Sequence, residues 1–285
     1  MVSIDDKSTA TTDLELIVRF CLDWWRDHPR QSVETAGRQV TMAWQASAEL
    51  VRALVHRRFP LSEFLRQSSF MAGVSATPTL LVAIPIAAIV SIQIGSLVSQ
   101  VGATTFIGAV NGLGIIRQGA PLVTCLMIAG AVGSSICADL GSRTIREEID
   151  AMRVMGVDPI GRLVAPRLLA AVLVSILLCG FVVFVGFATG YLFNIFIQDG
   201  TPGSYISTFA SFAVASDLLV ALVKAAVFGA LTAIIACDCG LNTKGGPGGV
   251  ANAVNSAVVS SAIVLFAANI ALTQIYNTVF PSKVL

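Results

Sequence analysis

Charged side chains are scarce in this chain of 285 residues. Only 12% of its residues are Asp, Glu, Lys or Arg, whereas a soluble domain of ordinary composition has about 25%. Hydrophobic residues make up 55% of the sequence. This combination excludes an ordinary soluble protein and predicts a chain that crosses a membrane several times.

Motifs for catalysis or metal binding are also lacking. The two histidines, His28 and His56, lie near the N-terminus, which excludes an imidazole-based active site inside the membrane. The six cysteines follow no spacing typical of a zinc site or a disulfide framework. The glycine-rich stretch 243–249 lacks the Gly-x4-Gly-Lys-Ser/Thr pattern of a phosphate loop. We therefore expect a non-catalytic chain that binds no metal and no cofactor.

Long apolar regions are abundant. Residues 78–98 are numerous enough to cross the hydrocarbon core, which takes about 20 residues. The next region, 106–140, is too long for one simple helix and contains the sequence RQGAP at 117–121, so we expect a broken or re-entrant entry followed by a full span over 122–139. The remaining regions are 163–197, 218–237 and 251–279. The predicted fold is an all-α polytopic membrane protein with five transmembrane helices.

The first 70 residues differ from the rest. They contain nine Lys or Arg and nine Asp or Glu, about half of all the charge. Apolar and small side chains recur with a helical period over about 33–59, around Trp44, and polar side chains lie between them. The pattern predicts an amphipathic helix in the membrane interface; the alternative is an ordinary amphipathic helix packed on a soluble partner. We divide the chain into an N-terminal segment, 1–70, and a transmembrane domain, 71–285.

The distribution of Lys and Arg predicts the orientation. The N-terminal segment and residues 143–167 are rich in these residues, and the connection after the fourth region contains Lys244. Segments 99–116 and 198–216 contain none. Because cytoplasmic loops of membrane proteins are enriched in Lys and Arg, we expect a cytoplasmic N-terminus and a periplasmic C-terminus in the inner (plasma) membrane.

Residues 143–158 form a polar island between the second and third apolar regions, with seven charged residues among sixteen. Thr144 and Glu147 fit a capping box, and Gly156 and Pro159 supply a stop. An apolar stripe runs along the same stretch: Ile145, Ile149, Met152 and Met155. The pattern predicts a short cytoplasmic helix over about 143–157 that docks on a partner; the alternative is a solvated surface loop.

The run 137–169, CADLGSRTIREEIDAMRVMGVDPIGRLVAPRLL, resembles the signature region of the MlaE/YrbE permeases. These are the transmembrane subunits of ABC lipid transporters that work with MCE-domain proteins. The likeness extends over most of the chain and includes GAVGS at 130–134 and GGPGGV at 245–250. The sequence SRTIREEIDAM is most similar to that of actinobacterial (mycobacterial) YrbE subunits of the A-type.

The resemblance implies a set of partners: a second permease of the B-type, a cytoplasmic ABC ATPase dimer that binds ATP and Mg²⁺, hexameric MCE-domain proteins and a lipid. Nucleic acid is not implied. The island then matches the coupling helix, which sits in a groove of the ATPase. Its candidate contact residues are Ile145, Arg146, Glu147, Glu148, Ile149, Asp150, Met152 and Arg153.

Two charged residues stand out within or near the apolar stretches and are candidate contacts for lipid or a partner. Arg117 lies beside the expected helix break, and its alternative role is that of an interfacial side chain that snorkels. Lys224 lies on one helical face with Asp217, so an ion pair between them is the alternative. At the end of the second region, Asp139 is expected to cap the helix or to pair with Arg143.

The leading functional hypothesis is a permease subunit of an ATP-driven lipid transporter, with an apolar lipid cavity lined from the first, second and fifth spans. A secondary carrier without an ATPase would show an internal repeat and paired broken helices with acidic ion sites. An intramembrane enzyme would need a catalytic dyad or metal ligands within the spans. Fatty acid, phospholipid and sterol all fit an apolar cavity, and the direction of transport stays open.

Overall fold

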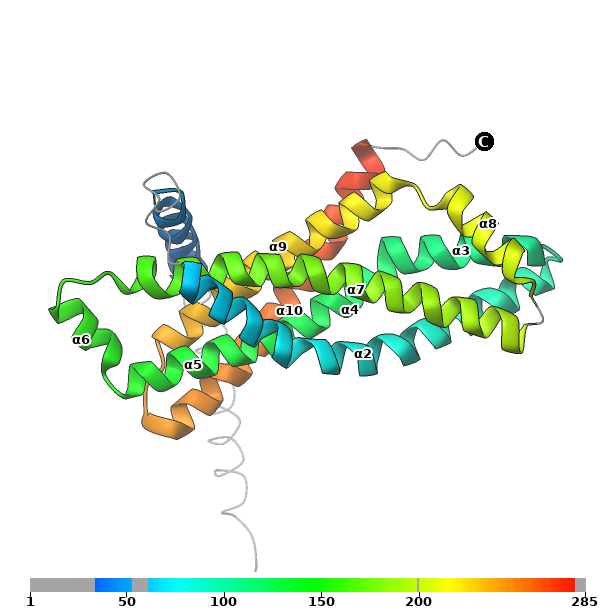
Figure 1. Cartoon of the computed structure of the whole chain (residues 1–285). Coiled ribbons are helices and arrows are strands. Elements are labelled where there is room, and N and C mark those ends of the chain that lie inside the picture. The colour runs from blue at the N-terminus through cyan, green and yellow to red at the C-terminus, as the bar shows by residue number, and fades with distance from the viewer. Residues whose placement is uncertain (1–33, 53–60, 199, 280–285) are drawn as a thin grey trace, which may run out of the picture. The chain divides into compact units, whose positions relative to one another are not determined.

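The computed structural model describes residues 34–52, 61–198 and 200–279, and the regular elements in these ranges are helices (Figure 1). The chain divides into two units, residues 1–44 and 45–285. In the first unit, residues 34–44 are helical, and this helix runs on to residue 52. It falls within the interfacial helix predicted for about 33–59, of which residue 33 and residues 53–59 lie outside the described residues. Its position in the membrane interface stays a prediction.

Five helices of the described ranges are long and apolar enough to cross a membrane. This confirms the predicted polytopic all-α architecture. Two of the five are composite, because a short π segment or a 3-10 turn continues directly into an α-helix. The five are α2 (Leu61–Gln100), the composite helix Thr104–Ile145, the composite helix Ile160–Ile197, α9 (Ala215–Leu241) and α10 (Gly246–Val279).

The first span starts earlier than the predicted residue 78. Hydropathy marks only the part of a helix that crosses hydrocarbon, whereas α2 begins at Leu61 and continues through Pro78 and Pro85. Its buried residues recur every fourth position, which gives one narrow face. This face packs against α7 (Ala165–Ile197), and its mostly small side chains let the two backbones approach. The buried residues are Gln67, Met71, Ser75, Thr79, Ala83, Ala87, Ser91 and Gly95.

The second span is continuous, so the predicted break or re-entrant entry at 117–121 is wrong. Two π segments lengthen the helix locally instead of interrupting it. The Ala120 N–H donates to the Ile115 carbonyl, five residues back, and Pro121 then falls in the first turn of the following helix, where its missing N–H costs little. The parts are α3 (Ile107–Gly114), η2 (Ile115–Gly119), α4 (Ala120–Met127), η3 (Ile128–Val132) and α5 (Gly133–Ile145).

Two short helices lie at opposite ends of the long ones, α6 (Glu148–Val154) and α8 (Pro202–Phe212) (Figure 1). We did not predict α8, because segment 198–216 showed only an absence of basic residues. Asn111 Nδ2 donates to Tyr205 Oη at 3.1 Å, which joins α8 to α3, and the rings of Phe187 and Phe209 are 4.6 Å apart. Burial raises the pKa of Tyr205 to about 12.

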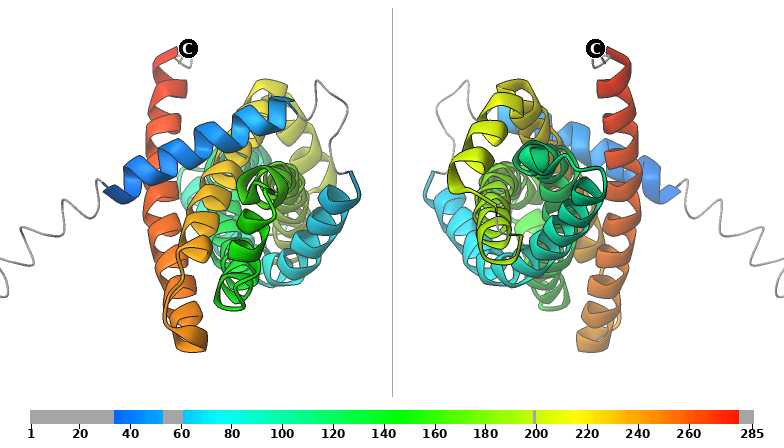
Figure 2. Two further views of the ribbon diagram at one scale, coloured as in Figure 1. Left: turned by 90° about the vertical axis from the view of Figure 1, so that its left-hand side faces the viewer. Right: turned by 90° about the vertical axis from the view of Figure 1, so that its right-hand side faces the viewer.

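The second span lies at the centre of the transmembrane helices. In the most apolar stretch of 18 residues in this span, 61% of the residues are buried, whereas only 22% are buried in the corresponding stretches of α2 and of α10. Figure 2 shows α10 at the edge of the group, where it packs on α9 and α5. Large apolar side chains are exposed on these outer helices, including Leu81, Ile263 and Ile270. Lipid or a second chain would cover such a surface.

Candidate functional site

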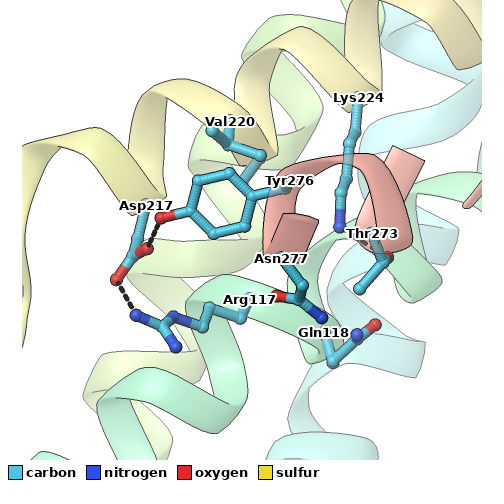
Figure 3. Close-up of a pocket in the computed structure, with 9 residues that line it drawn as sticks. Arg117, Gln118, Asp217, Val220, Lys224, Thr273, Tyr276 and Asn277 are labelled. Atoms are coloured by element: carbon cyan, nitrogen blue, oxygen red, sulfur yellow. Dashed lines mark hydrogen bonds and ion pairs between the residues drawn. The ribbon is translucent and has the colours of Figure 1, made fainter. Parts of the chain in front are cut away.

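A polar pocket of about 210 Å³ lies between the π segment η2, α9 and α10 (Figure 3). Each of these elements contributes polar side chains to it, although all three belong to membrane spans. The pocket brings together Arg117 and Lys224, the two cations predicted as lipid or partner contacts. Its lining residues are Arg117, Gln118, Asp217, Val220, Ala221, Lys224, Thr273, Tyr276 and Asn277.

Asp217 is the anion of the pocket and is held from two sides (Figure 3). Arg117 forms an ion pair with its carboxylate at 3.0 Å, and Tyr276 Oη donates to its other oxygen at 2.6 Å. The Asp217 side chain is 1% exposed, whereas that of Arg117 is 42% exposed. Part of the Arg117 side chain is therefore exposed beside a buried carboxylate, and its contact with lipid or a partner stays a prediction.

Lys224 does not pair with Asp217, so that alternative is wrong. The two residues are seven positions apart on α9, a rise of about 10 Å, and Arg117 and Tyr276 occupy the carboxylate instead. Lys224 Nζ donates to Thr273 Oγ1 of α10 at 2.9 Å, and the residue is 4% exposed. Among the residues that the structure describes, no carboxylate forms an ion pair with it.

The pocket thus has one net positive charge: two cations and one carboxylate. A cation inside a membrane span is costly without a partner, which makes Lys224 a candidate functional residue. Lys224 has three N–H donors, of which Thr273 takes one, and the amides of Gln118 and Asn277 line the same space. The arrangement can therefore accept an anionic group of small size.

We did not predict the α10 residues Thr273, Tyr276 and Asn277. The available signal was three polar side chains on nearly one helical face near the end of an apolar span, where a lipid-facing helix has no use for them. Only the packing of α10 on α9 turns that face toward Lys224 and Asp217.

The predicted docking helix corresponds to α6, but it is shorter than the predicted range of about 143–157. The capping box is wrong, because α5 continues through Thr144 and Ile145. The Thr144 hydroxyl donates to the carbonyls of Leu140 and Gly240, and the turn into α6 is made by Glu147 in a left-handed conformation, φ 61°. The predicted stop is confirmed: Gly156 has φ 74°, and Val157 N–H donates to Met152 O.

The surface of α6 differs from the predicted stripe. Ile149 is only 2% exposed and anchors α6 to its own chain, so the expectation that it is offered to a partner is not met. The exposed apolar side chains are Val154 at 89% and Met155 at 69%. Charged side chains surround them in two local ion pairs, Arg146–Glu148 at 3.1 Å and Arg153–Asp150 at 3.0 Å.

Near α6, the carboxylate of Asp139 joins two membrane helices, α5 and α7. Asp139 pairs with Arg143 of α5 at 3.3 Å, as predicted, and also with Arg167 of α7. Arg167 is 1% exposed. We did not single it out, because its position in the first turns of an apolar helix gave no sign that it turns inward. The ion pair Asp139–Arg167 thus acts as a clamp, because it joins the helix before α6 to the helix after it.

Comparison with known proteins identifies the family. A family model described as Permease MlaE matches residues 64–275. The chain belongs to the MlaE permease family. The match includes α6 and most of the pocket, and it places this MlaE chain among transporter subunits rather than enzymes. In the described ranges, no group of three or more His, Cys, Asp and Glu side chains is placed to hold a metal ion.

Several relatives of this MlaE permease are ABC transporter permeases by name. The chain is 31% identical over 244 residues to the Probable ABC transporter permease protein slr1045 of Synechocystis, covering 86% of this chain and 93% of the relative. It is 30% identical over 226 residues to a protein of the same description from Rickettsia felis, with coverage of 79% and 87%. It is also 30% identical over 239 residues to the chloroplastic protein TRIGALACTOSYLDIACYLGLYCEROL 1 of Arabidopsis thaliana, with coverage of 82% and 66%.

Proposed function

We propose that this MlaE permease is the transmembrane subunit of an ATP-driven, Mce-type lipid transporter and that it is an A-type YrbE subunit. The sequence SRTIREEIDAM at 142–152 supports the subtype through its resemblance to actinobacterial YrbE proteins. The name of the Arabidopsis relative contains that of a galactolipid, which supports a lipid as the transported molecule.

The observation that carries the proposal is the positively charged pocket around the buried Lys224. A lipid with an anionic head group would place that group in such a site and leave its acyl chains for the apolar surface nearby. Lys224 lies nine residues into α9, about 14 Å along the helix, so the site is within the half of the membrane where α9 begins. By the charge pattern this is the periplasmic half, the side on which MCE-domain partners would deliver or receive lipid.

In this mechanism the ion pair Arg117–Asp217 forms one wall of the pocket, and Lys224 is the group that binds the lipid. Asp217 already neutralises Arg117 at 3.0 Å, so the excess charge is that of Lys224. The head group would accept hydrogen bonds from Lys224 Nζ and from neighbouring amides. The wall joins the second span to α9, and a relative shift of these helices would change the shape of the pocket.

The second part of the mechanism is α6. We infer that it docks on a cytoplasmic ABC ATPase dimer that holds ATP and Mg²⁺, with Val154 and Met155 in the contact and the charged side chains at its rim. Rim charges set register and partner choice more than affinity. The clamp through Asp139 and Arg167 would transmit the movement of α6 to both α5 and α7. A second, B-type permease would cover the exposed apolar faces of α2 and α10.

One experiment on the purified complex tests both parts. We expect Lys224→Gln to retain one anionic lipid fewer per permease chain than the wild type, seen by mass spectrometry, and to keep the ATPase. We expect Val154→Asp with Met155→Asp to lose the ATPase and to keep the lipid, because burying two such side chains contributes about 3 kcal/mol, or about a hundredfold in affinity.

Charge reversal of the three carboxylates at Glu147, in the turn into α6, and at Glu148 and Asp150, in α6, should also abolish ATPase association while membrane insertion is unaffected. Arg162→Glu is the matched control, since Arg162 is exposed at the same end of the helices and lies outside α6. Stoichiometric ATPase in both α6 variants would reject the coupling role. Unchanged lipid retention in Lys224→Gln would reject the pocket as the lipid site.

A further inference from the structure

A second polar cavity, of about 220 Å³, lies between the first turns of α2 and the end of α5. Its walls are Arg66, Gln67 and Phe70 from α2 and Asp139 and Arg143 from α5. It lies beside the connection to α6, at the opposite end of the helices from α8 and far along the chain from the Lys224 pocket. The family comparison assigns no role to it.

The charges around this cavity do not balance. Arg66, Arg143 and Arg167 face two carboxylates, Glu63 and Asp139, which leaves one net positive charge. Both oxygens of Asp139 are used, one by Arg143 and the other by Arg167. Glu63 Oε1 accepts from Arg66 at 3.1 Å and from Gln67 at 2.8 Å. The charges of both carboxylates are therefore offset by neighbouring Arg side chains, so their repulsion of an anion is weak.

Hydrogen-bond donors remain available in the cavity. Arg143 uses only Nε, at 3.3 Å from Asp139, and Arg66 only one terminal nitrogen; no other hydrogen bond from either guanidinium occurs in the part of the chain that the structure describes. Arg66 is 66% exposed, so its guanidinium can turn to a ligand, and Arg143 is 25% exposed. The guanidinium groups of Arg66 and Arg143 border the same cavity, and their N–H donors match the oxygens of a phosphate group.

The surroundings suit a lipid better than a free anion. Phe70 is 50% exposed and continues the cavity wall toward the apolar part of α2. The Lys and Arg pattern places this end of the helices in the cytoplasm, which puts Arg66 and Arg143 near the head-group level of the inner leaflet. Basic pockets between transmembrane helices on this side bind anionic head groups.

We propose that the Arg66–Arg143 cavity binds the phosphate of an anionic phospholipid of the inner leaflet, a lipid that stays bound and is not transported. Such a lipid would bridge α2 and α5 directly beside the segment leading to α6. The proposal uses the predicted orientation but not the lipid role of the Lys224 pocket, so either one can fail without the other.

The test is native mass spectrometry of the purified complex in detergent with phosphatidylglycerol and phosphatidylcholine in equal amounts. We expect wild type and Lys224→Gln alike to retain one phosphatidylglycerol per permease chain at this cavity. Each arginine near a membrane surface contributes roughly fivefold to anionic lipid binding. Arg66→Gln with Arg143→Gln should therefore raise the dissociation constant about thirtyfold, and Arg162→Gln should leave it within twofold.

The single variant Arg66→Gln keeps the test usable if the double variant does not fold, because Arg66 is exposed; it should weaken binding about fivefold. Equal retention of phosphatidylcholine, or unchanged retention in both Arg66 variants, would overturn the proposal. So would inorganic phosphate that binds through the same two arginines and displaces phosphatidylglycerol at equal concentration, because the site would then hold a free anion. Retention that phosphate does not reverse supports the lipid.

Discussion

Replacement of Asp217 by Asn removes the one carboxylate among the described residues that line the Lys224 pocket, without changing the size of the side chain. The ion pair with Arg117 has an N–O distance of 3.0 Å, and two charges about 4 Å apart interact by about 4 kcal/mol at an effective dielectric constant near 20. Because 42% of the Arg117 side chain is exposed, water screens much of this, and about 2 kcal/mol remains. The hydrogen bond from Tyr276, 2.6 Å long, loses its charged acceptor, at a cost of about 1 kcal/mol.

Asp217→Asn should therefore destabilise the protein by about 3 kcal/mol, which lowers the midpoint of thermal unfolding by about 6 °C. Tyr276→Phe removes only the hydrogen bond and should lower it by about 2 °C. Arg117→Gln combined with Asp217→Asn leaves neither member of this ion pair as an unpaired charge, so the double variant should be more stable than the sum of the two single effects predicts. The measurement is thermal unfolding of the purified chain in detergent. A midpoint of Asp217→Asn within 1 °C of wild type, or additive single effects, would refute the reasoning.

Two further predictions concern the other end of the helices and the orientation. Burial raises the pKa of Tyr205 from 10 to about 12, so between these pH values the folded chain keeps a proton that the unfolded chain releases. The free energy of unfolding should therefore hold up to pH 10 and fall toward pH 12. Tyr205→Phe should lack this component, and an identical fall in the variant would contradict the prediction. The orientation can be tested in a background without the six native cysteines. Ser207→Cys in α8 should react with a membrane-impermeant maleimide in intact cells, whereas Ala151→Cys in α6 should react only after permeabilisation. The reverse pattern would reject the predicted orientation.

The sequence predicted those elements whose cause is local. Each hydrocarbon crossing needs its own run of apolar residues, so five spans could be counted. The stop of α6 was predictable because Gly156 and Pro159 act on their own backbone. The pair Asp139–Arg143 was predictable because residues four apart on a helix are neighbours.

Predictions that depended on competition between partners failed. A capping box at Thr144 and a continuation of α5 through Thr144 are both locally allowed, and the Gly240 carbonyl of α9 takes part in the second arrangement. Asp217 could have paired with Lys224, but Arg117 and Tyr276 reach it from other helices. Ile149 belongs to an apolar stripe, yet no pattern on one helix shows whether its own chain or a partner covers that stripe.

The amino-acid sequence by itself determined that this chain is helical, crosses the membrane five times and carries a polar segment between its second and third spans, because hydropathy and helix termination act over a few neighbouring residues. Tertiary structure alone decided which charges of different helices meet. Ion pairs form between side chains that packing brings within a few ångströms, and in this permease that packing joins η2 with α9 and α10, and α5 with α7.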